Sequence, residues 1–165
     1  MLTRLEADGF KNLINFSVDL GPYTCIAGIN AVGKSNVFDL IQFLSRLADL
    51  PFMEATQAIR SETSGGVDPK SLFWADGNGA TTMTVAAEMI VAPDVVDDFG
   101  RAAKATTTFL RYELELEYVD PMSTSMGMAG NILLKRESLN HINVSEARAH
   151  MGWPHSKKNF RDYVV

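Results

Sequence analysis

The sequence predicts an α/β fold in which a glycine-rich loop joins a strand to a helix and a largely antiparallel lobe follows. Residues 23–28, YTCIAG, form a short apolar run, typical of a strand covered on both faces. The stretch 28–36, GINAVGKSN, follows directly. Apolar residues at helical spacing then fill residues 37–47, and Pro51 stops the helix. The order is therefore strand, glycine loop, helix.

The elements before the loop are two predicted strands. Residues 2–10 form an apolar run broken by Gly9, which suits a strand better than a short helix. Residues 15–20, NFSVDL, alternate apolar and polar side chains, as a half-buried strand does. Gly21 and Pro22 supply the turn toward the loop.

The second half of the chain is predicted to be mostly strands and turns. Residues 60–80 are rich in Gly, Ser, Asp and Thr, so we expect a long loop around an apolar anchor at Leu72, Phe73 and Trp74. The later elements are a strand over 81–91, a short helix or ordered connection over 93–105, a strand over 109–120, a turn over 120–131 and a hairpin partner over 132–139.

Composition bounds the class of protein. The chain has 165 residues, of which 46% are apolar and 21% charged, as in one ordinary globular domain. A net charge of −5 argues against a whole surface built to bind nucleic acid, so any DNA contact must be local or made by another chain or segment. No run reaches the length of a membrane span, and we expect a soluble, cytoplasmic protein. The lone Cys25 is expected to be a small buried side chain.

The glycine loop (residues 28–36) fits the phosphate-binding pattern G-x-x-x-x-G-K-[ST], with Gly28, Gly33, Lys34 and Ser35 in the fixed places. Glycines are needed because successive backbone N–H groups must wrap around phosphate oxygens. Lys34 adds a positive charge for the β- and γ-phosphates, and the Ser35 hydroxyl completes the coordination of Mg²⁺. The loop therefore predicts a site for ATP and Mg²⁺.

The first 45 or so residues resemble the opening of the ABC-type ATPase heads found in SMC, RecF and OLD-like proteins. Those heads begin with a strand, a GF-[KR]-[NS] turn, a second strand and a G-x-N-x-x-G-K-[ST]-N loop. Here the turn is Gly9 to Asn12. The cofactor-binding residues that the resemblance implies are Gly28, Ile29, Asn30, Ala31, Val32, Gly33, Lys34, Ser35 and Asn36, with Ser35 as the metal ligand.

Lys11 has two interpretations. Heads of this class often place a basic side chain from this turn near the nucleotide phosphates, and the resemblance implies that role for Lys11. The alternative is a solvated turn lysine.

Ala31 departs from the family pattern, since many relatives have glycine there. No glutamine follows the long loop, because the chain's only glutamines are Gln42 and Gln57.

The resemblance implies a P-loop NTPase fold, specifically the N-terminal half of an ABC-type head with an antiparallel β lobe. We expect residues 1–165 to be one incomplete ATPase domain. Its parts are a strand, P-loop and helix core over 1–50, a loop-rich insertion over 51–80, the antiparallel lobe over 81–140 and a tail over 141–165 that leads to a missing C-terminal half. The implied roles are DNA maintenance or anti-phage defence, with a second ATPase copy, and with DNA or a nuclease as possible partners.

The catalytic residues of such a head are not identifiable in this sequence. TSGGVD, residues 63–68, imitates the signature motif but lies too early, and Pro69 follows where a helix should run. MIVAPD, residues 89–94, imitates the apolar strand that ends in an acid, but it lacks a second carboxylate. Hydrolysis is therefore expected of the complete protein. The alternatives are a compact kinase or GTPase using Asp94, and a non-catalytic interaction domain.

Two further groups are interpreted as surface residues. Glu113, Glu115 and Glu117 share one strand face, where glutamates two apart are usually solvated charge. The histidines have no zinc-ligand spacing and no cysteine partners, so surface positions are expected for His141, His150 and His155.

Overall fold

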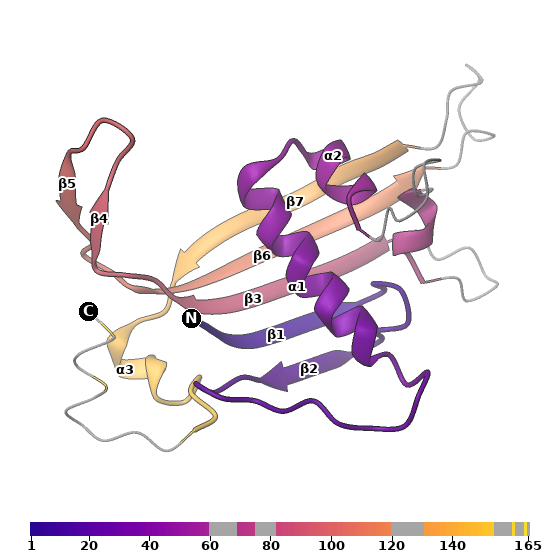
Figure 1. The fold of residues 1–165 in the computed structure, drawn as a ribbon, viewed down its shortest axis with the longest axis horizontal. Coiled ribbons are helices and arrows are strands. Elements are labelled where there is room, and N and C mark those ends of the chain that lie inside the picture. The colour runs from indigo at the N-terminus through magenta and orange to yellow at the C-terminus, as the bar shows by residue number, and fades with distance from the viewer. Residues whose placement is uncertain (60–68, 75–81, 120–130, 154–159, 161–163, 165) are drawn as a thin grey trace.

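The computed structural model describes residues 1–59, 69–74, 82–119, 131–153, 160 and 164. One antiparallel sheet carries the fold, with strand order β2-β1-β3-β6-β7 (Figure 1). Its strands are β1 Leu2–Asp8, β2 Phe16–Asp19, β3 Thr82–Ile90, β6 Phe109–Val119 and β7 Asn131–His141. The predicted strands over 2–10, 15–20, 81–91, 109–120 and 132–139 are thus confirmed, and the chain has a mixed α/β fold.

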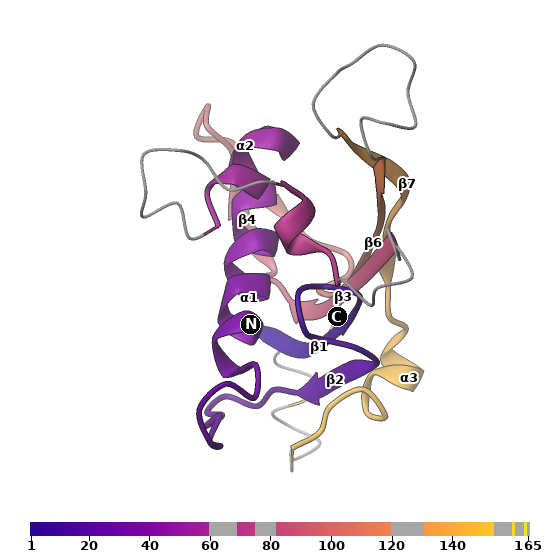
Figure 2. The ribbon, with the colours of Figure 1, turned by 90° about the vertical axis from the view of Figure 1, so that its right-hand side faces the viewer.

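Helices cover one face of this sheet (Figures 1 and 2). Helix α1, Lys34–Asp49, crosses the strands diagonally, and the short helix α2, Phe52–Gln57, follows it after Pro51. A 3₁₀ turn, Pro69–Leu72, leads to Phe73. The helix predicted after the glycine loop is confirmed, whereas α2 lies in a segment predicted to be loop-rich.

The main core lies between α1 and the sheet. Strand alternation turns Leu5, Val85 and Leu114 toward the helix, and Val85 is paired directly with Leu114. The rings of Phe10 and Phe43 stack there with centroids 6.0 Å apart. Leu72 and Phe73 are buried in the same core, so the predicted apolar anchor is confirmed for those two residues. This packing fixes α1, and hence the glycine loop at its start.

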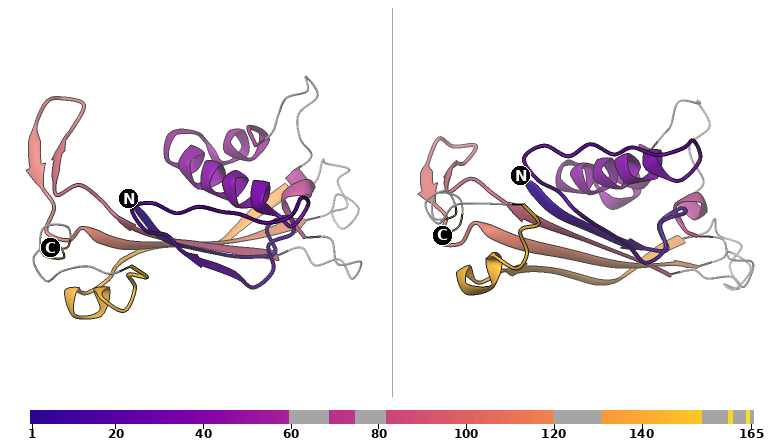
Figure 3. Two further views of the ribbon diagram at one scale, coloured as in Figure 1. Left: turned by 60° about the horizontal axis from the view of Figure 1, so that its bottom comes forward. Right: turned by 90° about the horizontal axis from the view of Figure 1, so that it is seen from below.

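The opposite face of the sheet carries the C-terminal segment at one end. Helix α3, Val144–Ala147, lies on this side (Figure 3). A second apolar cluster there joins Ile90 and Phe109 at the strand ends to Ala147 and Met151. The centre of this face carries charged side chains, among them Glu6, Glu88 and Arg111.

The connection between β3 and β6 is a β-hairpin rather than a helix. Its strands are β4, Asp94–Val96, and β5, Ala102–Lys104. The Asp97 carboxylate accepts hydrogen bonds from the backbone N–H groups of Phe99 and Arg101, and Gly100 takes a positive φ of 77°. The hydrogen bonds of the Asp97 side chain and the positive φ of Gly100 favour a hairpin here. The ordered connection predicted for 93–105 is therefore correct, and the helix is wrong.

The strand predicted over residues 23–28 does not form. These residues have no regular secondary structure, and most of them are exposed. Strand β2 lies at the edge of the sheet, and no other strand in the described residues pairs with this segment. Cys25 is consequently exposed, contrary to the expectation of burial. The apolar run had predicted a doubly covered strand, but the described chain supplies neither the neighbouring strands nor the covering layer.

The described residues include no helix that is both long and apolar enough to cross a membrane.

Candidate functional site

The glycine loop closes around the ammonium group of Lys34. Lys34 is the first residue of α1, and its Nζ donates to the carbonyl oxygens of Gly28 at 2.7 Å and Ile29 at 2.5 Å. The lysine charge is therefore held at the mouth of the loop by the loop's own backbone. It sits where an anion at the start of α1 would meet it.

Two left-handed residues give the loop its shape. Gly33 has φ 100° and Ala31 has φ 68°, a region that favours glycine. A Cβ on Gly33 would lie 2.7 Å from Oδ1 of Asn12, so the dihedral favours glycine and any larger residue would also displace the Asn12 side chain. Ala31 tolerates its dihedral at a cost of about 1–2 kcal/mol.

Backbone donors of the loop have no protein acceptors. Within the described residues, no backbone N–H of residues 29–35 donates to another protein group. Helix α1 has no side-chain cap at its N-terminus and no acidic residue in its first turn. Its positive dipole end is therefore not neutralised by the protein. Free donors, a helix N-terminus and Lys34 together form a donor set suited to phosphate oxygens.

The turn after β1 is attached to the beginning of α1. Nζ of Lys11 lies 2.7 Å from the Asp39 carboxylate, and both side chains are largely buried, with exposed fractions of 15% and 9%. The Asn36 amide donates to Oδ1 of Asn12 at 2.7 Å. The interpretation of Lys11 as a solvated turn lysine is therefore wrong. Its role toward phosphates stays a prediction.

Ser35 is exposed beside Lys34, as a metal ligand at this position has to be. Residues 29–32 are exposed too, so the loop is open to a ligand. No group of three or more His, Cys, Asp or Glu side chains in the described residues is placed to hold a metal ion. The role of Ser35 as a ligand of Mg²⁺ stays a prediction.

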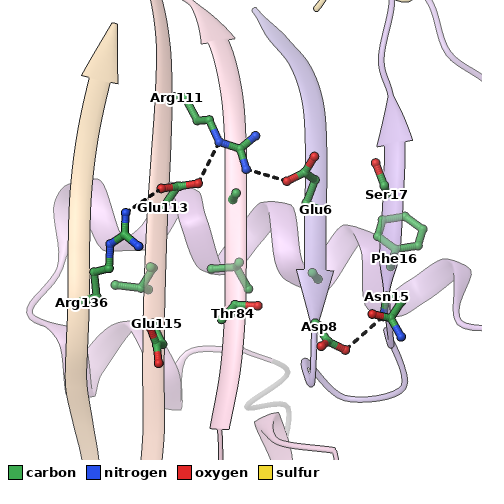
Figure 4. A pocket seen from close by; sticks show the side chains of 14 residues that line it. Glu6, Asp8, Asn15, Phe16, Ser17, Thr84, Arg111, Glu113, Glu115 and Arg136 are labelled. Carbon is green, nitrogen blue, oxygen red and sulfur yellow. Dashed lines mark hydrogen bonds and ion pairs between the residues drawn. The ribbon is translucent and has the colours of Figure 1, made fainter. Parts of the chain in front are cut away.

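A second polar region lies on the other face of the sheet (Figure 4). It surrounds a pocket of about 300 Å³ between β1, β2, β3 and β6, and we call it the polar sheet face. Its centre is Arg111, which binds three carboxylates, those of Glu6 at 2.6 Å, Glu88 at 2.8 Å and Glu113 at 2.9 Å. Arg136 reaches Glu113 at 3.4 Å.

The charges around Arg111 are paired with one another. Hydrogen bonds from Arg111 hold the pKa of Glu113 below its ordinary value. Burial would raise the pKa of Glu6, but hydrogen bonds from Arg111 and Arg4 outweigh it, and the pKa is lowered. The buried Glu88 also accepts His150 at 3.0 Å. These contacts satisfy the side chains within the protein, which is typical of a structural network.

Three predicted surface residues turn out to be paired. Glu113 belongs to the Arg111 network, and Glu117 lies 2.8 Å from Lys135. His150 reaches the buried Glu88 and stands edge-on to Phe109. The expectation of solvated charge is wrong for the two glutamates, because Arg111 lies two residues from Glu113 on the same strand and Lys135 of the neighbouring strand reaches Glu117.

Both imitations of catalytic motifs lie away from the loop or outside the described residues. Asp94 begins the β4–β5 hairpin, at the opposite end of the molecule from the glycine loop (Figure 1). Residues 63–68 lie outside the described residues. Gln42 belongs to α1, and Gln57 ends α2. The acid of the MIVAPD motif, Asp94, is therefore not placed beside the glycine loop (Figure 1).

Sequence reasoning missed two residues that position the loop. Asp39 falls between the apolar residues of the predicted helix, and in the structure it is buried and binds Lys11. Asn12 was noted only within the turn, although it lies against Gly33 and Asn36. A signal existed for Asp39, which lies between the apolar Val37 and Leu40 on the buried side of the helix.

Comparison with known proteins gives limited matches. No family model matches the chain, and no curated protein matches it significantly. A search of solved structures finds a chain from work on the structural biochemistry of ATP-driven dimerization and DNA-stimulated activation of SMC ATPases. The two chains are 21% identical with a TM-score of 0.45, and the match covers 83% of this chain and 71% of the other. This identity and TM-score do not establish a family for the chain.

Proposed function

We propose that this chain is the ATP-binding part of an ABC-type ATPase head of the SMC, RecF and OLD-like class. The observation that carries the proposal is the donor set of the glycine loop. Among the described residues, the N–H groups of residues 29–35 have no protein acceptor, and they belong to the same segment as the start of α1 and the Lys34 ammonium. Such a set suits phosphate oxygens and little else.

Mg²⁺ is the metal proposed for this site. The exposed Ser35 hydroxyl would be its protein ligand, since Mg²⁺ usually keeps several waters and shares the phosphates of the nucleotide. When bound, the metal neutralises phosphate charge. This chain's own contribution is to orient the phosphates through the loop backbone and to place Lys34 beside them.

A second ATPase copy is proposed to cover the exposed surface around the loop. Tyr23 is 88% exposed, Ile29 78% and Phe38 58%, which is unusual for large apolar side chains so close together in sequence. A nucleotide held between two copies would bury such residues. Roles in DNA maintenance or phage defence, and DNA or nuclease partners, belong to the same proposal and depend on other segments.

Titration of a fluorescent ATP analogue with Mg²⁺ tests ATP binding. We expect Lys34→Ala to weaken binding by roughly ten- to a hundredfold, because a charge-assisted hydrogen bond contributes about 1.5–3 kcal/mol. Unlabelled ATP should compete better than GTP, since the sequence has no N-K-x-D guanine motif. Equal affinity of wild type and Lys34→Ala contradicts the proposal. A strong preference for GTP favours a GTPase instead.

Binding without useful turnover is the second expectation. Hydrolysis requires a group that orients water and a group that stabilises charge on the γ-phosphate. Asp39, a carboxylate near the start of α1, is bound to Lys11, and the sequence identifies no carboxylate pair for these roles. Phosphate release by the purified chain should therefore stay at the level of Lys34→Ala. Turnover near about 10 s⁻¹ that is lost in the variant would show a complete active site.

A further inference from the structure

The β4–β5 hairpin presents an apolar tip to solvent. Phe99 is 84% exposed, Val96 70% and Val95 48%. The hairpin stands away from the end of the sheet, on the same side as α1 (Figures 1 and 3). An exposed aromatic beside two exposed valines on one projecting element marks a contact surface rather than scattered surface residues.

The tip is held in one shape before any contact is made. Oδ1 of Asp97 accepts the N–H groups of Phe99 and Arg101 at 2.9 and 2.8 Å, and Oδ2 accepts Nε of Arg101 at 2.6 Å. The Arg101 guanidinium lies 5.3 Å from the centre of the Phe99 ring. An ordered aromatic with an adjacent arginine is the composition of a binding hot spot, because little entropy remains to be lost.

A cavity of complementary chemistry lies on the same side of the sheet. Its volume is about 490 Å³, and it opens between α1 and strands β3, β6 and β7. We call it the α1–β7 groove; the lining residues that matter here are Leu44, Leu47, Met89, Tyr112, Glu137 and Leu139. Leu139 is 61% exposed although it lies in the groove, so the groove lacks a cover in the single chain.

The tip and the groove match in size and charge. A cavity of about 150 Å³ already takes up benzene, so about 490 Å³ accommodates the Phe99 ring with its valine neighbours. Glu137 is the acidic residue of the groove, and its Oε1 accepts the Tyr112 hydroxyl at 2.7 Å. Arg101 uses Nε for Asp97 and is 76% exposed, which leaves its fork of N–H donors available to a carboxylate such as Glu137.

We propose that the β4–β5 hairpin of one copy inserts Phe99 into the α1–β7 groove of a second copy, and that the second copy does the same in return. The groove lies between α1 and the sheet, and α1 and the hairpin lie on the same side of the sheet (Figure 3). A two-fold axis on that side would satisfy both contacts at once. Each aromatic buries about 150–250 Å². Two such insertions, with the valines and the groove walls, approach the roughly 1,000 Å² that a specific interface needs.

This contact is independent of the nucleotide and of the proposed ATPase function. The glycine loop lies at the other end of the molecule from the hairpin (Figure 1). The dimer therefore forms without ATP, whereas a nucleotide sandwich forms only with it. Failure of ATP binding leaves the present proposal intact, and the reverse also holds.

Analytical ultracentrifugation of the nucleotide-free chain tests the proposal with complementary variants. Phe99→Asp damages the tip, and Leu139→Asp damages the groove; both side chains are exposed, so the fold is expected to tolerate each change. We expect a wild-type dimer, and at least a tenfold weaker dimer for each variant alone. An equimolar mixture of the two variants should regain dimer, because the intact tip of Leu139→Asp fits the intact groove of Phe99→Asp. Val144→Asp is the matched control, since Val144 is 49% exposed on α3.

Three outcomes would overturn the proposal. One is a monomeric wild type at the highest soluble concentration. Another is a dimer that neither variant weakens. A dimer that only Phe99→Asp weakens, with no recovery in the mixture, also contradicts the proposal, because the groove then lies outside the interface. The third is growth into longer oligomers with rising concentration, because a reciprocal contact closes at two copies.

Discussion

The glycine loop and the polar sheet face are both rich in polar groups, but they differ in where the hydrogen bonds go. On the polar sheet face, Arg111 binds three carboxylates, and the cations there meet partners from neighbouring strands. In the loop, the N–H groups of residues 29–35 meet no protein acceptor in the described chain. Charge satisfied internally indicates stability, and donors left without partners indicate a ligand.

The largest expected effect is a loss of stability when the Arg111 network of the polar sheet face is removed. Arg111→Met removes one partner of Glu88, whose side chain is 1% exposed, and leaves it paired with His150. We expect a loss of about 3 kcal/mol in unfolding free energy, because removing one member of a buried ion pair strands the other. Urea denaturation measures it. ATP-analogue affinity of the folded variant should not change.

Arg136→Met is the matched control for that prediction. Arg136 is 64% exposed and touches Glu113 at 3.4 Å, so its loss should cost less than about 1 kcal/mol. Equal losses for the two arginines would contradict the account of Arg111 as the centre of the network.

The next effect concerns the shape of the loop. Gly33→Ala places a Cβ 2.7 Å from Oδ1 of Asn12 at φ 100°, and we expect it to cost at least about 1–2 kcal/mol. Gly28→Ala is the control, because its Cβ would meet only ordinary contacts from 3.4 Å outward. Thermal unfolding and analogue titration of both variants measure the difference. A Gly33→Ala variant as stable as Gly28→Ala would show that the loop is differently shaped in solution.

The smallest effect is a gain. Ala31→Gly removes the strain of an alanine at φ 68°, which stabilises the folded state by about 1–2 kcal/mol. Glycine also raises the entropy of the unfolded chain, which lowers the stability by about 0.4–1 kcal/mol. We expect the variant to be more stable by about 0.5 kcal/mol in urea denaturation. A clear loss of stability would mean that residue 31 does not hold a left-handed conformation.

Local patterns predicted most of this fold. The alternation in residues 109–120 fixed which side chains of β6 face α1, and the spacing after Lys34 fixed the helix, since both depend on neighbouring residues alone. The expected strand over 23–28 failed because a strand needs partners, and partners are a property of the whole assembly. The hairpin at Asp94–Lys104 depended on the side chain of Asp97, which periodicity does not register.

In the candidate site, too, features set by neighbouring residues could be predicted and contacts between distant residues could not. The motif located Lys34 and Ser35 because spacing along one loop sufficed. The contacts of Lys11 with Asp39 and of Asn12 with Asn36 join residues 28 and 24 positions apart, and no local pattern reports them. The Arg111 network likewise joins three strands, with Glu6 lying 105 positions away.

NMR titration of the ¹⁵N-labelled chain with ATP and Mg²⁺ compares the two regions in one experiment. Backbone amide signals respond to new hydrogen bonds, so the amides of residues 29–35 should move strongly if phosphate takes up their free donors. Amides of Glu6, Arg111 and Glu113 should stay in place, because that network is already complete. Strong shifts on the polar sheet face with a silent glycine loop would contradict the assignment of the nucleotide site.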